Sequence, residues 1–436
     1  MLNHAIIESL DREGRGVAHV EGKAIFIDGA LPAEVVSYSS YRKKPSYEFA
    51  QIVELKNASS SRVDAQCPWY GRCGGCALQH YDLRAQIAAK QRILEDALWH
   101  IGRVRAGRML SPVSGPAWGY RHRARLSVRL VPKKGGVLVG FHERKSSYVA
   151  EMTSCEVLPP RISDAIAKLR ELVSQLSIRD GLPQVEVAVG ERVSVMVLRI
   201  LAAPSAQDEV LLKRFAEEGD FQIWLQTKGP DTARPFWPLD APALDYVLPE
   251  FDVRIGFLPT DFTQVNHAVN RILVRLALGL LNPRASDRIG DFFCGLGNFT
   301  LPLGRSGASV SGWEGSDGLV ARARLNAQGN GLADHCRFEA VNLFEAEACE
   351  RVLRTAGKLD KVLIDPPREG AIELVKALTV NNEAERIVYV SCDPATLARD
   401  AAILVKDHKY VLDAAGVINM FPHTAHVESI AVFERC

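Results

Sequence analysis

Long apolar runs are absent from this sequence: nowhere in its 436 residues do roughly 18 consecutive apolar residues occur, the length that a membrane span needs. The first eight residues have neither a basic start nor an apolar segment of the secretory type. An excess of either charge is also absent, since 53 Lys and Arg face 52 Asp and Glu. We therefore expect a cytoplasmic protein without a membrane span, and a uniformly basic nucleic-acid binder is excluded.

Low-complexity segments and repeats of fixed period are absent as well. The hydrophobic content of 47% and charged content of 24% are typical of globular proteins and exclude a disordered or collagen-like chain. At about 150 residues per domain, the length predicts two or three domains.

Basic and acidic side chains are unevenly distributed along the chain, although the net charge is only +1. Residues 1–61 hold 7 basic and 8 acidic side chains, residues 62–155 hold 16 and 6, and residues 156–436 hold 30 and 38. The middle stretch therefore carries a positive field that could attract a polyanion such as a nucleic acid. A solvated, charge-decorated pair of strands is the alternative.

The chain divides into three regions, at 1–60, 61–255 and 256–436. The first contains short alternating segments that predict strands at 5–10, 16–21, 23–28, 34–41 and 47–56. Five strands in so few residues predict a small closed barrel, an architecture that often binds single-stranded nucleic acid.

The middle region predicts an α+β arrangement. Its helix at 82–101 has apolar residues at helical spacing, which predict the core face: Leu83, Ile87, Ile93, Leu94, Leu98 and Ile101. In the strand that follows, apolar residues alternate with arginines, so one face should be core and the other should carry Arg123, Arg125 and Arg129. Further strands are expected at 185–189 and 194–200, and helices at 161–176 and 207–218.

From about Gly256 onward the pattern changes to alternating helices and strands. A helix is predicted at 266–281, and strands are predicted near 287–293, 309–314, 336–341, 360–364 and 386–391. This alternation predicts an α/β fold with a doubly wound, Rossmann-like parallel sheet.

A glycine-rich turn follows the first of these strands, in Asp291-Phe-Phe-Cys-Gly-Leu-Gly-Asn-Phe-Thr. Gly295 and Gly297 allow close backbone approach to a ligand, and Glu314 ends the next strand, where a carboxylate can accept both ribose hydroxyls. Because position 300 is Thr, the full dinucleotide pattern is incomplete. This favours S-adenosylmethionine over a nicotinamide cofactor; another nucleotide or a structural turn are the alternatives.

The fourth strand ends in Asp365-Pro-Pro-Arg. A similar Asp-Pro-Pro followed by an aromatic residue marks enzymes that methylate exocyclic amino groups, in which the aromatic ring stacks on a flipped base. Arg368 occupies the aromatic position here, which weakens that interpretation without eliminating it.

The fifth strand is followed by Cys392, with Asp393 and Pro394 forming an N-cap and first-turn pair for the next helix. A cysteine at such a position sits where ligands bind and where a helix N-terminus lowers a thiol pKa, although Asp393 would oppose that shift. Cys294 is the rival nucleophile, and a buried inert cysteine is the alternative.

Four other cysteines form a ligand pattern: Cys67, Cys73, Cys76 and, farther on, Cys155. Disulfides are not expected in a cytoplasmic chain. Zinc usually uses two C-x2-C pairs, whereas one such pair with an offset cysteine is more typical of iron–sulfur sites, so a [4Fe-4S] cluster is favoured. The other three cysteines have no such pattern and are predicted to be structural: Cys336, Cys349 and Cys436.

Taken together, these motifs resemble the RNA uracil-C5 methyltransferases, in the branch that has an N-terminal TRAM barrel and an iron–sulfur cluster and modifies large-subunit ribosomal RNA. The resemblance covers nearly the whole chain. It rests on the four cysteines with Gln79-His80, on Phe262-x-Gln-x-Asn266, on the glycine-rich turn, on Asp365-Pro-Pro-Arg, on 391–400 and on 421–428.

The resemblance implies a TRAM-like, OB-like barrel at 1–60, an iron–sulfur domain at 61–255 and a methyltransferase domain at 256–436. It also implies 23S rRNA as the substrate, with uracil 1939 as the expected site, and a monomer. Its implied contacts to S-adenosylmethionine are Gln264, Phe293, Asn298, Glu314, Asn342 and Asp365. Cys392 would be the nucleophile that adds to uracil C6. Asp393 stands where the family commonly has Asn, which leaves the pKa of Cys392 undetermined.

The base that removes the C5 proton has three candidates, His423, His426 and Glu428. Histidine is the general choice near neutral pH, but burial can raise a glutamate pKa towards neutrality, and the resemblance assigns this role to Glu428. The alternative has Glu428 pointing outward at the start of the final strand. Other functions kept open are methylation of tRNA or of another rRNA site, amino methylation through Asp365, and a non-catalytic RNA-binding iron–sulfur protein.

Overall fold

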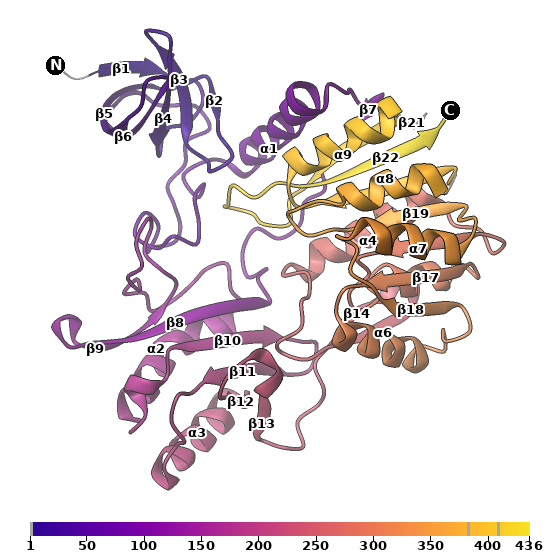
Figure 1. Ribbon diagram of the computed structural model, residues 1–436. Helices are drawn as coiled ribbons and strands as arrows, with labels where there is room; N and C mark the ends of the chain where they lie inside the picture. Colours follow the sequence, from indigo (N-terminus) through magenta and orange to yellow (C-terminus); the bar gives the residue numbers. More distant parts are fainter. Residues whose placement is uncertain (1–2, 382–383, 408–409) are drawn as a thin grey trace.

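The computed structural model describes residues 3–381, 384–407 and 410–436, and within these ranges the strands form four sheets. Figure 1 shows a small N-terminal β-unit, a middle sheet with helices beside it, and a larger sheet covered by helices. Within the described ranges, no helix has the length and apolar composition to cross a membrane.

The N-terminal unit is a six-stranded sheet in the order β1-β5-β6-β4-β3-β2. Its strands are Asn3–Ile6 (β1), Ser9–Leu10 (β2), Gly16–Val20 (β3), Lys23–Asp28 (β4), Val35–Lys43 (β5) and Tyr47–Asn57 (β6). The edge strands β1 and β2 are consecutive in the chain, so the sheet curls until its two edges meet. The segment predicted as one strand at 5–10 divides here, because Ile7 N bonds Glu34 O beside β5 whereas Glu8 N bonds Val17 O on β3.

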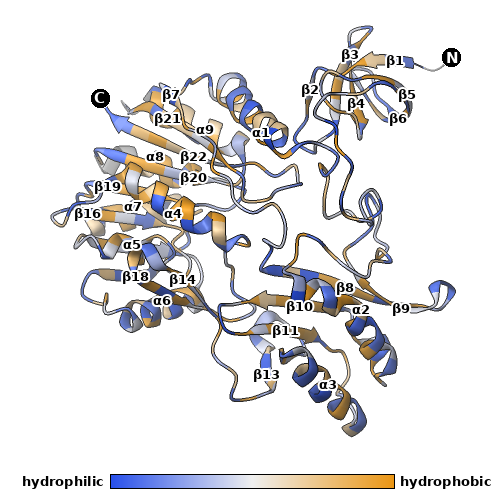
Figure 2. Cartoon of the chain, turned by 180° about the vertical axis from the view of Figure 1, so that it is seen from behind, coloured by the Kyte–Doolittle hydropathy of each residue, from blue (hydrophilic) through white to orange (hydrophobic). Residues whose placement is uncertain are grey.

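The middle sheet has the order β13-β12-β11-β10-β8-β9. Its elements are Arg123–Val131 (β8), Gly136–Gly140 (β9), Pro160–Gln175 (α2), Gln184–Val189 (β10), Ser194–Arg199 (β11), Ala206–Gly219 (α3), Gln222–Gln226 (β12) and Arg234–Trp237 (β13). The predicted strands and helices of this region are confirmed. Both helices bury one side in a core with the sheet, and Figure 2 shows α2 and α3 with orange and blue residues at helical intervals.

The large sheet has the order β18-β17-β16-β19-β20-β22-β21-β7. Its strands are Arg108–Met109 (β7), Arg288–Phe292 (β16), Ser309–Glu314 (β17), Cys336–Ala340 (β18), Lys361–Ile364 (β19), Arg386–Ser391 (β20), Tyr410–Ile418 (β21) and Glu428–Arg435 (β22). β16 to β20 run parallel, whereas β22 pairs antiparallel with both β20 and β21. A hairpin precedes this region: Asp245–Leu248 (β14) and Val253–Gly256 (β15).

Helices cover both faces of the large sheet, which gives the sheet two separate cores. The helices are His267–Leu281 (α4), Thr300–Gly304 (α5), Asp317–Gly329 (α6), Ala346–Ala356 (α7), Ile372–Asn381 (α8) and Pro394–Asp407 (α9). The first three contribute to one core, and α7 to α9 contribute to the other. The predicted doubly wound α/β sheet is therefore confirmed.

The segment between the barrel and the middle sheet also packs on the large sheet. It contains α1 (Leu83–Ala97), a π-helical turn at Leu98–Gly102 and β7, which pairs parallel with β21. The prediction of its core face is wrong in part, because Leu83, Ile87 and Ile93 are only half-buried and Ile101 is 53% exposed. The buried residues of α1 are Gln86, Lys90 and Leu94. Two polar side chains can occupy this face because it meets a polar loop as well as apolar side chains.

Candidate active site

A cavity of about 620 Å³ lies at the carboxyl edge of the large sheet. Parallel strands bring their carboxyl ends to the same edge, so loops that are distant in sequence converge there. All eight residues predicted for the cofactor site and the chemistry line this cavity: Gln264, Phe293, Asn298, Glu314, Asn342, Asp365, Cys392 and Glu428. The roles assigned to them individually stay predictions.

The glycine-rich turn after β16 has the conformation that its sequence suggested. Gly295 and Gly297 have φ values of 54° and 91°, and Phe293 has a φ of 64°, which is unusual for an aromatic residue. The turn brings the backbone N–H of Gly295 to 3.2 Å from Glu314 Oε2. The loop and the end of the neighbouring strand β17 therefore form one continuous wall of the cavity.

Asn298 is held by side chains that the sequence analysis did not identify. Its Oδ1 accepts hydrogen bonds from the Tyr246 hydroxyl and from Asn270 Nδ2, both at 2.9 Å. Its Nδ2 donates to Asn270 Oδ1 at 3.0 Å. The sequence carries no local signal for this network, because Tyr246 comes from the β14–β15 hairpin and Asn270 from α4.

Acidic groups predominate among the charged side chains of the cavity. Glu314, Asp365 and Glu428 line it, together with Arg121 and Arg368. Burial raises the pKa of Asp365 to about 7. This excess of carboxylates suits a ligand that carries positive charge.

Asp291, beneath the glycine-rich turn, is a further buried acid that was absent from the predicted site. Burial raises its pKa to about 7, and its Oδ2 accepts a hydrogen bond from the Thr300 hydroxyl. The other oxygen, Oδ1, is buried without a hydrogen-bond partner among the described residues. The signal for this residue was present in the sequence, since an acidic side chain stands near the end of the strand that leads into the glycine-rich turn.

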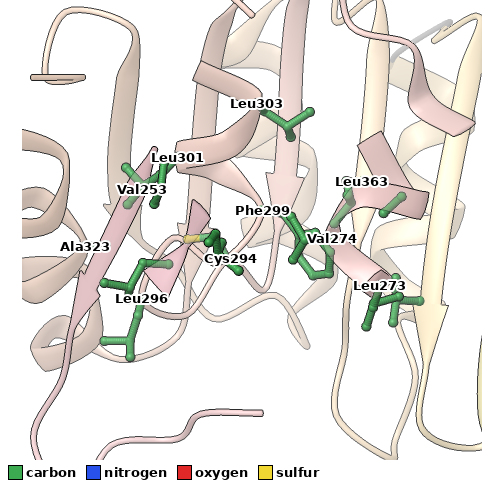
Figure 3. Packing of buried hydrophobic residues seen from close by; sticks show 14 of the residues in the cluster. Val253, Leu273, Val274, Cys294, Leu296, Phe299, Leu301, Leu303, Ala323 and Leu363 are labelled. Atoms are coloured by element: carbon green, nitrogen blue, oxygen red, sulfur yellow. The ribbon is translucent and has the colours of Figure 1, made fainter. Parts of the chain in front are cut away.

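The two candidate nucleophiles have different environments. Cys392 follows β20, is half-buried and lines the cavity. Cys294 is only 3% exposed, and Figure 3 shows its side chain within an apolar cluster beside Leu296. Burial raises the pKa of the Cys294 thiol well above its usual value. The structure therefore favours Cys392 as the accessible thiol.

The pKa of the Cys392 thiol, which the sequence left undetermined, is raised in the structure. Burial raises the pKa of this thiol to about 12, and the nearby carboxylates of Glu428 and Asp365 add to the increase, whereas Arg368 opposes it. Desolvation and like charge thus outweigh the helix N-terminus in the ligand-free protein.

Asp393 is the capping residue that the sequence predicted. Its second carboxylate oxygen also forms an ion pair that the sequence did not predict. Its Oδ1 accepts the backbone N–H of Ala395 at 2.8 Å, as an N-cap does. Its Oδ2 forms an ion pair with Arg12, from the turn between β2 and β3 of the barrel. The barrel therefore contacts the residue next to Cys392, through a pair that is separated by 381 positions in the chain.

Glu428 lies next to Cys392 because of strand pairing. Ser391 at the end of β20 pairs with Ser429 on β22, so the residues adjacent to this pair share the same edge of the sheet. Glu428 is 7% exposed, so the outward-facing alternative is wrong. Burial, reinforced by Asp365, raises its pKa to about 8. A carboxyl group with that pKa can accept a proton near neutral pH.

The two histidines near Glu428 have other surroundings. His423 is buried and stacks on Trp118 with ring centroids 4.0 Å apart. His426 lies at the rim of the cavity, with Arg368 Nη2 at 3.4 Å from both of its ring nitrogens.

A second cavity, of about 220 Å³, is lined by all four cysteines of the predicted ligand pattern: Cys67, Cys73, Cys76 and Cys155. None of the four is in a disulfide. Within the described ranges, no three His, Cys, Asp or Glu side chains converge closely enough to hold a single metal ion. The four thiols therefore share one cavity without converging on a single point, and four thiolates are the donor set of an iron–sulfur cluster.

Comparison with known proteins agrees with this geometry. The tRNA (Uracil-5-)-methyltransferase family model matches residues 250–436. The 23S rRNA (uracil(1939)-C(5))-methyltransferase RlmD of Nitrosospira multiformis is 62% identical over 431 residues, which is 99% of this chain and 98% of that protein. The chain belongs to the RNA uracil-C5 methyltransferase family.

Other members of this RNA uracil-C5 methyltransferase family extend the comparison. RlmD of Chromobacterium violaceum is 57% identical over 99% of this chain and 84% of its own length. The solved structure of the Pyrococcus abyssi tRNA (uracil-54, C5)-methyltransferase, in complex with S-adenosyl-L-homocysteine, matches with a TM-score of 0.75. It covers 99% of this chain and all of its own chain at 24% identity, so it shows a common fold.

Proposed function

We propose that this protein transfers a methyl group from S-adenosylmethionine to C5 of a uridine in 23S rRNA, with uracil 1939, the position in the names of its relatives, as the site. The observation that carries the proposal is the placement of Cys392 and Glu428 side by side in one cavity with the glycine-rich turn and Asp365. The cavity thus combines a thiol, a base and the wall for a cofactor.

The cavity fits S-adenosylmethionine by its chemistry. Gly295 presents its backbone beside the Glu314 carboxylate, which can accept ribose hydroxyls. The acidic lining suits the positive charge of the sulfonium and amino groups. When bound, this cofactor supplies an electrophilic methyl group. Gln264, Phe293, Asn298, Glu314, Asn342 and Asp365 would hold it.

The chain supplies the remaining chemistry. Uracil C5 is a poor nucleophile, so the Cys392 thiol must lose its proton and add to C6, which turns C5 into an enolate carbon that can take the methyl group. Glu428 then removes the C5 proton, the C5–C6 double bond re-forms, and the thiolate leaves. The target base must be out of its stack, which costs least in a loop or an opened RNA segment.

The four cysteines are proposed to hold a [4Fe-4S] cluster with a structural role. Their loop is tied to the active site, since the backbone N–H groups of Ala77 and Leu78 both donate to His423 O at 2.9 Å. A group that joins this loop to Cys155 would therefore fix the barrel linker, the middle sheet and the segment before Glu428 relative to one another.

Replacing Cys73 with serine should remove the brown colour of the cluster and lower the melting temperature, because one thiolate ligand is lost. Iron content, visible absorbance and calorimetry measure this. Cys436→Ser is the matched control, since Cys436 is exposed and outside the cysteine cavity. A colourless, zinc-loaded wild type of full activity would contradict the assignment.

The barrel and the middle sheet are proposed to hold the RNA around the target base. A further hollow of about 650 Å³ opens beside Cys392 and is lined by the barrel turn that carries Arg12. On β8, Ala124, Leu126 and Val128 are buried, as the alternation predicted, whereas Leu130, the next residue of the same alternation, is 37% exposed. The opposite face is less cationic than expected, because Glu186 on β10 lies against its arginines.

The arginine face gives a quantitative prediction. Glu186 lies 2.8 Å from Arg125 and 3.8 Å from Arg123, whereas Arg129 is exposed and forms no ion pair with a carboxylate of the described residues. Replacing all three arginines with Gln should reduce the slope of log binding constant against log salt concentration by about 1 to 2. This corresponds to the loss of fewer than one phosphate contact per arginine. Glu186→Gln should have the opposite effect and tighten binding. Unchanged affinity and slope in both variants would mean a solvated face without RNA contact.

Mapping of 5-methyluridine in RNA from cells with and without this gene tests the proposed function. Loss of one methylated 23S rRNA position is expected. Loss of a tRNA position instead would support the tRNA alternative, and loss of a methylated amino group would support the chemistry of Asp365-Pro-Pro. Loss of none would leave a non-catalytic RNA-binding protein.

A further inference from the structure

A buried lysine lies next to the active site without lining its cavity. Lys90 is 1% exposed in the middle of α1. Its ammonium group donates to Asn419 Oδ1 at 2.8 Å and to the backbone oxygen of Phe421 at 2.9 Å. Lysine is rarely buried unless it is paired, because desolvation of its charge is costly. The burial of Lys90 therefore suggests a functional role.

Both acceptors belong to the strap, residues 419–427, which connects β21 to β22 and leads directly into Glu428. The strap has a second anchor on α1, one helical turn earlier. Gln86 is fully buried and accepts the backbone N–H of His423 at 2.9 Å. The entry of the chain into β22 is therefore fixed by two neighbouring polar side chains, one charged and one neutral.

Charge is what distinguishes the two anchors. Lys90 and Arg368 act to lower the pKa of Glu428, whereas burial and Asp365 raise it to about 8. The Cys392 thiol faces the same carboxylate. Arg368 is exposed, so water and RNA phosphates compete for its charge, whereas Lys90 is shielded from solvent.

Lys90 itself is balanced between two opposing influences. Burial lowers its pKa to about 7, and the negative charge of Glu428 acts to keep the proton on it. The positive charge of Lys90 in turn helps to lower the pKa of His423, which falls to about 4, and of His426. Two groups that can both be charged near neutral pH, one acidic and one basic, are thus coupled within a buried region.

We propose that Lys90 is a positioning residue for Glu428: it anchors the strap and supplies a buried positive charge that favours the ionised form of the base. The inference rests on the proposed function, since it assigns Glu428 the removal of the C5 proton. Lys90 takes no part in thiol addition or methyl transfer. Its loss should therefore slow one step of the reaction.

Three variants separate the charge from the anchor. Lys90→Gln keeps a hydrogen-bond donor but removes the charge, Lys90→Met removes both, and Gln86→Met removes the neutral anchor alone. Each is assayed in single turnover with labelled S-adenosylmethionine and a 23S rRNA fragment, across pH 6 to 10. Formation of the covalent RNA adduct and release of methylated RNA are followed separately on denaturing gels.

In both Lys90 variants we expect the pH midpoint for release to rise by about one unit or more, because Glu428 loses a nearby opposite charge. The covalent adduct should therefore accumulate at pH 7. Adduct formation should change much less. Gln86→Met should leave the midpoint in place, because it removes a neutral anchor and no charge. The inference fails if the Lys90 midpoints stay at the wild-type value, or if Gln86→Met shifts its midpoint equally.

The experiment also identifies two other outcomes. In one, Lys90 anchors the strap but its charge has no role; in the other, the proposed function itself is wrong. If Lys90→Met slows release and Lys90→Gln behaves as wild type, the charge is dispensable and the proposal is overturned. Because Lys90→Gln retains a donor for the strap, it tests the charge even if Lys90→Met does not fold. A wild type that methylates no uridine would instead refute the proposed function.

Discussion

Cys392→Ala is expected to abolish methyl transfer, with a loss of at least about 1000-fold, as for other covalent nucleophiles. Without the thiolate, C5 of uracil cannot become an enolate carbon, and the other thiol that lines the cavity, Cys294, is only 3% exposed and has a strongly raised pKa because of its burial. S-adenosylmethionine and RNA should still bind, because Cys392 contributes little of either binding surface. Methyl incorporation and binding of both ligands are measured on the same preparation.

The thiol can also be identified by trapping. With RNA that contains 5-fluorouracil at the target position, the wild type should stop as an adduct that survives denaturation, because fluorine at C5 cannot leave as a proton does. Cys294→Ala is the matched control and should still form the adduct, since its side chain is packed in the core. Activity retained by Cys392→Ala and lost by Cys294→Ala would reverse the assignment.

Glu428→Gln is expected to stop the reaction after methyl transfer, because the base acts only on the C5 proton. General bases typically contribute about 100- to 10,000-fold, so release should slow by that order while a methylated RNA linked to Cys392 accumulates. The accumulated species should be visible on a denaturing gel with the methyl label. Absence of any trapped species in this variant would assign proton removal to solvent or another residue.

His426→Gln is the matched control for this experiment, since His426 lies at the rim of the same cavity. The His426→Gln variant should release product. If it instead traps the adduct while Glu428→Gln turns over normally, His426 and not Glu428 is the base.

The raised pKa of Glu428 gives release a defined pH dependence. The carboxylate form is the active one, and with a pKa of about 8 it is the minor form at pH 7. Release by the wild type should therefore rise about tenfold per pH unit below 8 and level off above it. A flat profile between pH 6 and 9 would show that Glu428 does not limit this step.

The sequence by itself determined the fold of the last region and the placement of most candidate residues. Its strand–helix alternation required parallel strands, and parallel strands bring their carboxyl ends together. Glu314, Asp365 and Cys392 each lie at or just after such an end, so their convergence could be predicted without coordinates. Three of the four cysteines were likewise identified by spacing, because ligands on one loop must lie close together, whereas the fold brings the distant Cys155 to the same cavity.

Only the tertiary structure decided which distant groups meet and how strongly each is desolvated. The antiparallel pairing of β20 and β22 places Glu428 beside Cys392, and burial with two carboxylates raises the thiol pKa that a helix N-terminus alone would lower. Lys90 is buried because the strap covers it, and the apolar spacing of its helix does not predict that burial. Dielectric environment and long-range pairing are properties of the packed chain, and no local pattern of residues encodes them.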